Sequence, residues 1–169
     1  PDRAVIVYSN WIKKQFRDSI IVLGGAESSL RRFTHYDYME NRLRKSIILD
    51  SRTDILVYGN GEKQILEIAS MLKNKIQEDK IKANAGEEID KALEGIEGTC
   101  IIRKNFHLGI NFLELPSHEQ VCSSKAKFCD MQNMLTNHRN LVQRAGDRYV
   151  LQFKSPKYYP ADLDEYYEL

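Results

Sequence analysis

The sequence lacks any apolar run near the roughly 20 residues that a membrane-spanning helix needs. It has no secretory signal pattern at its start, where Pro1 stands without a methionine, which suggests a processed or excised chain. Charge of one sign is also missing, since 25 Lys and Arg face 24 Asp and Glu, for a formal net charge of +1. We therefore expect neither an anionic membrane nor nucleic acid as a partner.

Cysteine is scarce and irregularly placed. Cys100, Cys122 and Cys129 are an odd number, which argues against a secreted disulfide framework and favours a reducing, cytoplasmic setting. There is no CxxC pair and no Cys/His spacing typical of zinc, so we expect no metal site in this chain. We interpret the three residues as buried or incidental thiols.

Nucleotide-binding motifs are absent too, because neither GxGxxG nor GxxxxGK[ST] occurs. The most distinctive stretch that is present covers residues 20–38. It opens with four apolar residues that suit a buried strand, and Gly24 and Gly25 then allow a sharp turn. A dense set of polar and ionisable side chains follows: Glu27, Arg31, Arg32, His35, Tyr36, Asp37 and Tyr38.

Helix and strand patterns alternate through the first hundred residues. They predict helices over residues 1–17, 35–49 and 62–77 and buried strands over residues 20–23 and 54–58. In the first helix Val5, Tyr8, Ile12 and Phe16 form one apolar stripe. The alternation indicates parallel strands joined by right-handed crossovers, a Rossmann-like α/β layer over residues 1–98. Two strong strands are too few for a finished sheet, so either part of it lies outside the chain or later strands complete it.

The second half is less regular. After a polar connection over residues 79–88 and a short helix over 89–96, we expect strands at residues 99–103 and 110–115. Ser117 or Ser123 can cap helices running towards Leu135, and residues 141–152 read as a hairpin that turns at residues 145–147. Residues 99–154 thus form an α+β extension, and residues 155–169 read as a linker.

Both glycine turns follow predicted strands, the first at Gly24 and Gly25 and the second at Gly59, Asn60 and Gly61. Ligands of open parallel sheets bind beyond the carboxyl ends of the strands, where helix starts offer free N–H groups to a phosphate or carboxylate. The turns are neighbours if their strands are adjacent. Glycines needed only for packing are the alternative to ligand contact.

The polar residues after the first turn allow two interpretations. Arg31 and Arg32 can bind a phosphate or carboxylate, and His35 can exchange a proton with Asp37 orienting it. Alternatively, an arginine pairs with Glu27 or Asp37 and only fixes the loop. No nucleophile–base pair indicates hydrolysis, and we expect His107, His118 and His138 at the surface.

Residues 22–38, VLGGAESSLRRFTHYDY, resemble the N-terminal region of the YgiQ-type radical SAM proteins, in which this segment reads close to GGIEASLRRFAHYDYW. Residues 1–4, 44–50, 54–62, 114–117, 146–150 and 167–169 agree as well, so the resemblance covers essentially the whole chain. The departures, at Ala26, Ser28 and Asn60, are small. Residues 54–62 also look like the strand and turn of cobalamin-binding-type domains, but the DxHxxG-type loop with the cobalt-ligating histidine is missing.

The resemblance implies a parent iron–sulfur enzyme that binds a [4Fe–4S] cluster through a CxxxCxxC motif and cleaves S-adenosylmethionine. This chain has no such motif, so we expect the cluster on a barrel domain of the same polypeptide that begins shortly after Leu169. The chain is then an N-terminal accessory domain, with no catalytic residues of its own, that covers the barrel and helps to form the pocket for an unidentified substrate.

The candidate substrate-binding or interface residues are Gly24, Gly25, Glu27, Arg31, Arg32, His35, Tyr36, Asp37, Gly59, Gly61 and Glu62. The alternative is a non-catalytic module that binds a nucleotide-like or cobalamin-like ligand at the glycine turns. In a third interpretation the arginine-rich loop is only an interdomain contact.

Overall fold

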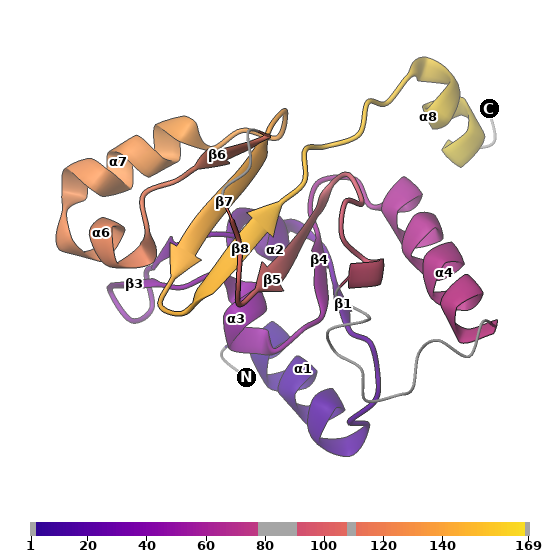
Figure 1. Cartoon of the computed structure of the whole chain (residues 1–169), viewed down its shortest axis with the longest axis horizontal. Coiled ribbons are helices and arrows are strands. Elements are labelled where there is room, and N and C mark those ends of the chain that lie inside the picture. Colours follow the sequence, from indigo (N-terminus) through magenta and orange to yellow (C-terminus); the bar gives the residue numbers. More distant parts are fainter. Residues whose placement is uncertain (1–2, 78–90, 108–110, 168–169) are drawn as a thin grey trace.

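A mixed sheet of six strands organises the fold in the computed structural model, which describes residues 3–77, 91–107 and 111–167 (Figure 1). The strands follow one another across the sheet in the order β1, β4, β5, β8, β7, β6. Their bounds are β1 Val22–Leu23, β4 Ile55–Val57, β5 Thr99–Arg103, β8 Arg148–Gln152, β7 Asn140–Ala145 and β6 Phe112–Glu114.

The α/β class is confirmed, but the sheet is not parallel throughout. β1 and β4 are parallel neighbours, with Val22 opposite Ile55, as the alternating pattern predicts. β5 then runs antiparallel to β4, β8 to β5 and β7 to β8, and only β6 returns to a parallel pairing, with β7. The strands after residue 98 therefore continue the sheet begun by β1 and β4, which is the alternative in which later strands complete it.

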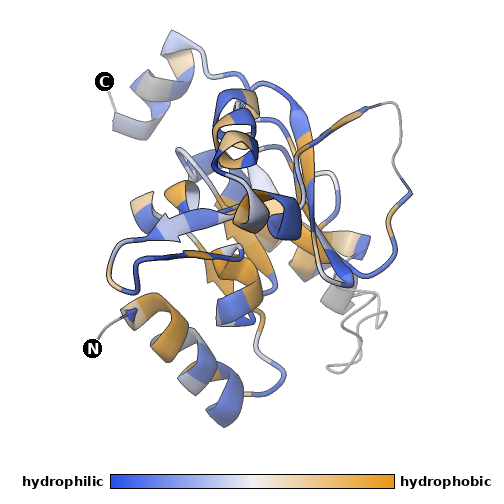
Figure 2. Cartoon of the chain, turned by 90° about the vertical axis from the view of Figure 1, so that its left-hand side faces the viewer, coloured by the Kyte–Doolittle hydropathy of each residue, from blue (hydrophilic) through white to orange (hydrophobic). Residues whose placement is uncertain are grey.

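Alternating side chains of the strands face two apolar layers. On one face, Leu56, Cys100 and Val150 pack with α3 (Ile47–Ser51), α6 (His118–Ser123) and α7 (Lys125–Met134). On the other face, Ile55, Ile101 and Leu151 pack with Ile68 of α4 (Glu62–Gln77), together with Leu93 and Ile96. Figure 2 shows the apolar residues, coloured orange, gathered in the middle of the molecule, where the strands lie.

The prediction of a helix over residues 35–49 is wrong. That segment is a hairpin of β2 (His35–Asp37) and β3 (Arg42–Arg44), followed by the short helix α3. Local hydrogen bonding explains the difference, because the Asp37 carboxylate accepts the Met39 N–H at 3.0 Å and Asn41 adopts a left-handed φ of 51° in the turn. These contacts stabilise a turn where the apolar spacing alone suggests a helix.

α1 (Ala4–Gln15) forms as predicted, but its apolar stripe is only partly covered. Val5 and Ile6 pack against the core, whereas Tyr8, Ile12 and Phe16 of the expected stripe are exposed, and so is Trp11 at 61% of its surface. Tyr8 and Trp11 contact each other, with ring centroids 5.6 Å apart. The amphipathic pattern thus identifies the helix correctly but not the face that is buried.

The remaining elements of the second half are close to expectation. Ser117 starts α6 with a capping box, in which its hydroxyl accepts the Gln120 N–H, while Ser124 rather than Ser123 caps α7. The β7–β8 hairpin turns at Gly146, whose φ is 67°. The expected linker contains a helix, α8 (Pro160–Tyr167). The expected connection over residues 79–88 lies outside the described residues, as does the start of the expected helix over 89–96.

No helix in the described ranges is long and apolar enough to cross a membrane.

Candidate functional site

The two glycine turns lie side by side at the carboxyl ends of β1 and β4, as predicted from strand adjacency. Gly25 has a φ of 96° and precedes α2 (Ala26–Leu30), and Gly59 has a φ of 71°. The Gly59 N–H donates to the Ser29 hydroxyl at 3.1 Å, which joins the turns. A Cβ added at Gly25 or Gly59 would meet no atom within 4 Å, so the backbone conformation, not tight packing, requires glycine there. We call this region the glycine edge, made of residues 24–32 and 59–64.

The C-terminal part of the described chain runs along the glycine edge. The Gly98 N–H donates to the Lys154 carbonyl at 2.7 Å, and the Tyr158 hydroxyl lies 3.0 Å from the Asn60 carbonyl oxygen. Lys63 pairs with Asp162 at 2.7 Å, and its ammonium lies 5.0 Å from the centre of the Tyr158 ring. The entrance to α8 is therefore fixed against the start of α4.

Gln64 is the buried polar residue of this edge, with only 1% of its surface exposed. Its Oε1 lies 3.1 Å from the Tyr158 hydroxyl, and its Nε2 has no partner among the described residues. A hydroxyl carries one hydrogen, so Tyr158 cannot donate to both Asn60 and Gln64. The Tyr158 hydroxyl therefore donates to one of these oxygens and lies beside the other, which places Asn60 and the buried Gln64 amide around one phenol group.

The two arginines of the first motif have different surroundings. Arg31 pairs with Glu27 at 2.8 Å, one helical turn away. Arg32 donates to Gln152 Oε1 at 2.7 Å, to Asn137 Oδ1 at 2.9 Å and to the Ser29 carbonyl, and its guanidinium lies 5.0 Å from the centre of the Tyr58 ring. Arg31 thus forms the pair with Glu27 that the second interpretation allows, whereas Arg32 ties α2 to the sheet through other partners.

His35 and Asp37 are both buried on β2, but no hydrogen bond joins them among the described contacts. Burial, helped by the charge of Arg31, lowers the His35 pKa, and its Nδ1 lies 3.2 Å from the Phe33 carbonyl oxygen. Asp37 accepts hydrogen bonds from Arg3 at 2.8 and 3.1 Å instead, which lowers the Asp37 pKa to about 2. The expected role of Asp37 in orienting His35 is therefore not what the contacts show.

The eleven candidate residues consequently form two groups. Gly24, Gly25, Glu27, Arg31, Arg32, Gly59, Gly61 and Glu62 belong to the glycine edge, whereas His35, Tyr36 and Asp37 belong to the β2–β3 hairpin. Within the described residues, no hydrogen bond or ion pair joins the two groups. Of the three candidate residues on the hairpin only Tyr36 is accessible, with 53% of its surface exposed.

Sequence reasoning missed a thiol–imidazole pair on α6. The Cys122 Sγ lies 3.5 Å from His118 Nε2, and Thr34 Oγ1 lies 3.0 Å from His118 Nδ1. The i,i+4 spacing behind the Ser117 cap is the signal that could have found it. Partial burial raises the Cys122 pKa and lowers the His118 pKa, so the pair favours a neutral thiol beside a neutral imidazole. It lacks the thiolate that nucleophilic catalysis requires.

The cysteines of this chain do not fit an iron–sulfur cluster. Cys100 is fully buried in the core, and burial raises its pKa to about 12, whereas Cys122 and Cys129 are exposed on two different helices. A radical SAM cluster needs three thiolates on one loop. In the described part of the chain, no three Cys, His, Asp or Glu side chains gather in a way that could hold a metal ion.

The six-stranded sheet with helices on both faces defines a mixed α/β protein, with the glycine edge at the carboxyl ends of its two parallel N-terminal strands. Comparison with known proteins assigns the family: residues 1–169 match the radical SAM N-terminal family, and the chain belongs to it. It is 42% identical over 175 residues to a UPF0313 protein of Methanocaldococcus jannaschii, covering 100% of this chain and 27% of that protein.

Bacterial relatives agree. A UPF0313 protein of Clostridium botulinum (strain Okra) is 38% identical over 176 residues, which are 100% of this chain and 26% of that protein. One of Geobacter sulfurreducens is 37% identical over 179 residues, with 100% and 27% covered. The chain thus spans about a quarter of the length of the curated relatives it matches. No solved structure matches it.

Proposed function

We propose that the chain is the N-terminal accessory domain of a longer radical SAM enzyme and is not catalytic alone. The barrel that follows in the same polypeptide carries the [4Fe–4S] cluster and binds S-adenosylmethionine, and the parent protein is cytoplasmic. The glycine edge lies against the barrel, where it helps to form the substrate pocket or covers the barrel mouth. Residues 1–98, 99–154 and 155–169 act as the α/β part, its extension and the link to the barrel.

One observation carries this proposal: the C-terminal segment is fastened to the glycine edge. The Tyr158–Asn60 hydrogen bond and the Lys63–Asp162 ion pair hold the start of α8 beside the first turn of α4. A domain attached after this segment begins next to the glycine edge. The relatives, of which the matched region is only about a quarter, have ample length for such a domain.

Different candidate residues then serve different purposes. The partly exposed Glu27–Arg31 pair and the exposed side chains of Tyr36 and Glu62 are accessible to a neighbouring domain or a substrate. Arg32, His35 and Asp37 are positioning residues, because their polar groups are occupied within the chain. The parallel pairing of β1 and β4, with a glycine turn after each strand, supports placing a ligand or partner at this edge, without implying that cobalamin binds.

The experiment uses the full-length polypeptide, reconstituted anaerobically with iron and sulfide. The proposal predicts about four irons per chain and formation of 5′-deoxyadenosine from S-adenosylmethionine and reductant. The double variant Arg31→Ala/Glu62→Ala should keep its iron but change the rate of S-adenosylmethionine cleavage, while Lys125→Ala on α7 should change neither. An absent cluster, or a double variant that behaves like Lys125→Ala, contradicts the proposal.

The second candidate function is a non-catalytic module that binds a small ligand at the glycine edge. It is favoured by the open space above Gly25 and Gly59. A thermal-shift screen with nucleotides and cobalamins tests it, because a ligand that binds only the folded state raises the apparent stability. Stabilisation by one ligand class supports this function, and no stabilisation by either class removes it.

A further inference from the structure

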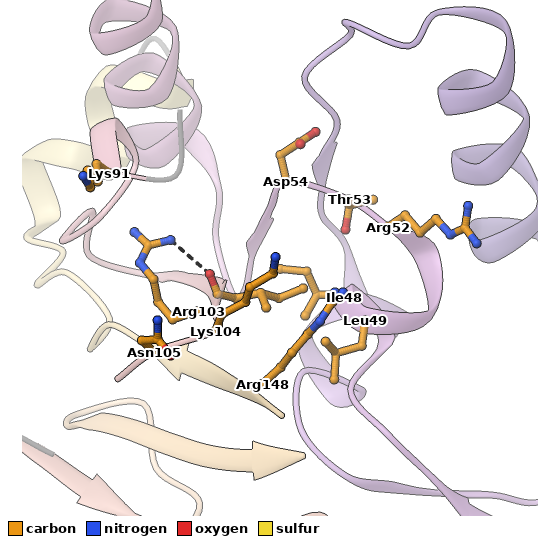
Figure 3. Close-up of a pocket in the computed structure, with 11 residues that line it drawn as sticks. Ile48, Leu49, Arg52, Thr53, Asp54, Lys91, Arg103, Lys104, Asn105 and Arg148 are labelled. Carbon is orange, nitrogen blue, oxygen red and sulfur yellow. Dashed lines mark hydrogen bonds between the residues drawn. The ribbon is translucent and has the colours of Figure 1, made fainter. Parts of the chain in front are cut away.

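A hollow lies at the end of the strands opposite to the glycine edge, where β4 begins and β5 ends (Figure 3). Its volume is about 560 Å³, within the usual range of small-molecule sites. Leu49 and Ile102 supply an apolar surface above the fully buried Ile48, and Lys104 and Arg148 supply positive charge. We call this hollow the basic pocket, defined by these five residues.

The strand register brings the two cations of the basic pocket together. The last registered pair of β5 and β8 is Arg103 opposite Tyr149. Lys104 directly follows β5 and Arg148 begins β8, so the two antiparallel strands bring both side chains to the lining of one hollow. Two cations gathered in one hollow repel each other and create a local positive potential.

No acid of the described chain offsets that potential. Within the described ranges, Lys104 and Arg148 form no ion pair. Asp54 is the carboxylate of the lining, but it pairs with Lys13 at 2.8 Å and accepts the Ile21 N–H at 2.7 Å. Figure 3 shows its carboxylate directed away from Lys104 and Arg148. The neighbouring Arg103 pairs with Glu94 at 2.9 Å and is partly neutralised.

We propose that the basic pocket binds a phosphorylated small molecule. The phosphate lies between Lys104 and Arg148, where the arginine can donate two parallel hydrogen bonds and the lysine adds a point charge. The apolar part of the ligand covers Leu49 and Ile102. Binding removes the repulsion between the two cations, which makes a dianionic group a better ligand than a neutral one.

The chemistry also selects against other ligands. S-adenosylmethionine has a sulfonium and an ammonium group against one carboxylate, so its net positive charge opposes entry. A nucleic acid would need cations spread along a continuous groove, whereas here they converge on one pocket of a chain whose net charge is +1. A phosphate with a compact apolar or aromatic body, as in a nucleotide, fits both the charge and the lining.

Calorimetric titration of the chain with inorganic pyrophosphate, ADP and adenosine at constant ionic strength tests the proposal. We expect saturable binding of ADP and of pyrophosphate and none of adenosine. Lys104→Ala and Arg148→Ala should each weaken binding about tenfold or more, the loss expected for one charge-assisted hydrogen bond. The control variants Lys125→Ala and Arg139→Ala, each of which removes one positive charge from a surface outside the pocket, should bind like the parent.

Thermal unfolding without ligand separates lost binding from lost structure. Since each pocket substitution removes one of two like charges, the unliganded variants should melt at the parent temperature or above it. Equal weakening in the pocket and control variants overturns the proposal, as does the absence of saturable binding to ADP and pyrophosphate. Binding of ADP and pyrophosphate by the longer polypeptide but not by this chain also overturns the proposal, because residues outside the chain would then supply the site. None of these results bears on the glycine edge, which lies at the other end of the strands.

Discussion

Arg31 and Arg32 are adjacent in the chain, yet they interact with the protein in different ways. Arg31 stays on the outer side of α2 and reaches Glu27, an ion pair with both members partly exposed. Arg32 turns towards the sheet, where its guanidinium meets Gln152, Asn137 and the face of Tyr58. Arg31 therefore forms a surface ion pair, whereas Arg32 anchors α2 to the sheet.

This difference predicts unequal costs of substitution. Arg32→Ala removes several hydrogen bonds to a cation and leaves the buried Gln152 Oε1 without its donor, so we expect a loss of about 3 kcal/mol in the free energy of unfolding. Arg31→Ala, the matched control, should cost about 0.5 kcal/mol or less, as exposed ion pairs do. Urea denaturation measures both, and equal costs would contradict the division of roles.

Asp37 predicts how stability depends on pH. Its pKa is about 2 in the folded protein, against an ordinary value of 3.8, because Arg3 and the N–H groups of Met39 and Glu40 favour the charged carboxylate. The unfolded chain therefore takes up the proton first as the pH falls. The stabilisation is complete above about pH 5 and is lost as the pH drops through 4 towards 2.

Urea midpoints measured between pH 6 and pH 2.5 test this prediction. Asp37→Asn should be less stable than the parent at pH 6, and the difference should shrink towards pH 2.5. The control is Asp147→Asn at the β7–β8 turn, where Asp147 forms no ion pair within the described residues. If the difference in urea midpoint between Asp37→Asn and the parent stays constant with pH, the Arg3–Asp37 contact is not its source.

At the scale of elements, the helix starts are decided by single hydroxyl groups. The Ser117 hydroxyl accepts the Gln120 N–H at 3.2 Å, and Gln120 Oε1 accepts the Ser117 N–H at 2.9 Å. Ser123, the other candidate cap in the sequence, donates instead to the Gln120 carbonyl at the end of α6. One serine therefore begins a helix and the other lies at its last turn.

We therefore expect Ser117→Ala to reduce the free energy of unfolding by about 1 kcal/mol, the typical value of an N-cap. Ser123→Ala should stay within about 0.5 kcal/mol of the parent, because its hydroxyl satisfies no free N–H of a helix start. Chemical denaturation of the two variants side by side gives the comparison. A larger loss in the Ser123 variant would reverse the assignment of the cap.

The sequence was most informative where one interaction dominates. Hydrophobic period and turn glycines identified β1, β4, α4 and the β7–β8 hairpin, because local pattern and tertiary burial agree there. The β2–β3 hairpin was missed because its apolar spacing resembles that of a helix, while Asp37 favours the turn through its local bond from Met39 and its distant partner Arg3. The same limit applies to the site: the glycine turns were found, but Gln152 and Asn137, the side chains that accept hydrogen bonds from Arg32, lie more than a hundred positions away.

At the scale of the whole molecule, the sheet joins the two halves of the chain. β5 and β8 lie between the β1–β4 pair and the β7–β6 pair, so the order of strands does not follow the order of the sequence. Such an order depends on pairings between distant segments, which periodicity does not encode. The sheet also separates the two candidate sites, because the glycine turns lie at one end of the strands and the basic pocket lies at the other.

The central claim is that the glycine edge lies against the rest of a longer radical SAM polypeptide. Amide hydrogen exchange tests it most directly, by comparing the 169-residue chain with the full-length polypeptide. The account predicts that amides in residues 24–32 and 59–64 exchange at least about tenfold more slowly in the full-length protein, while those of α7 are unchanged. Equal exchange at the glycine edge in both proteins, with protection appearing elsewhere or not at all, would contradict the claim.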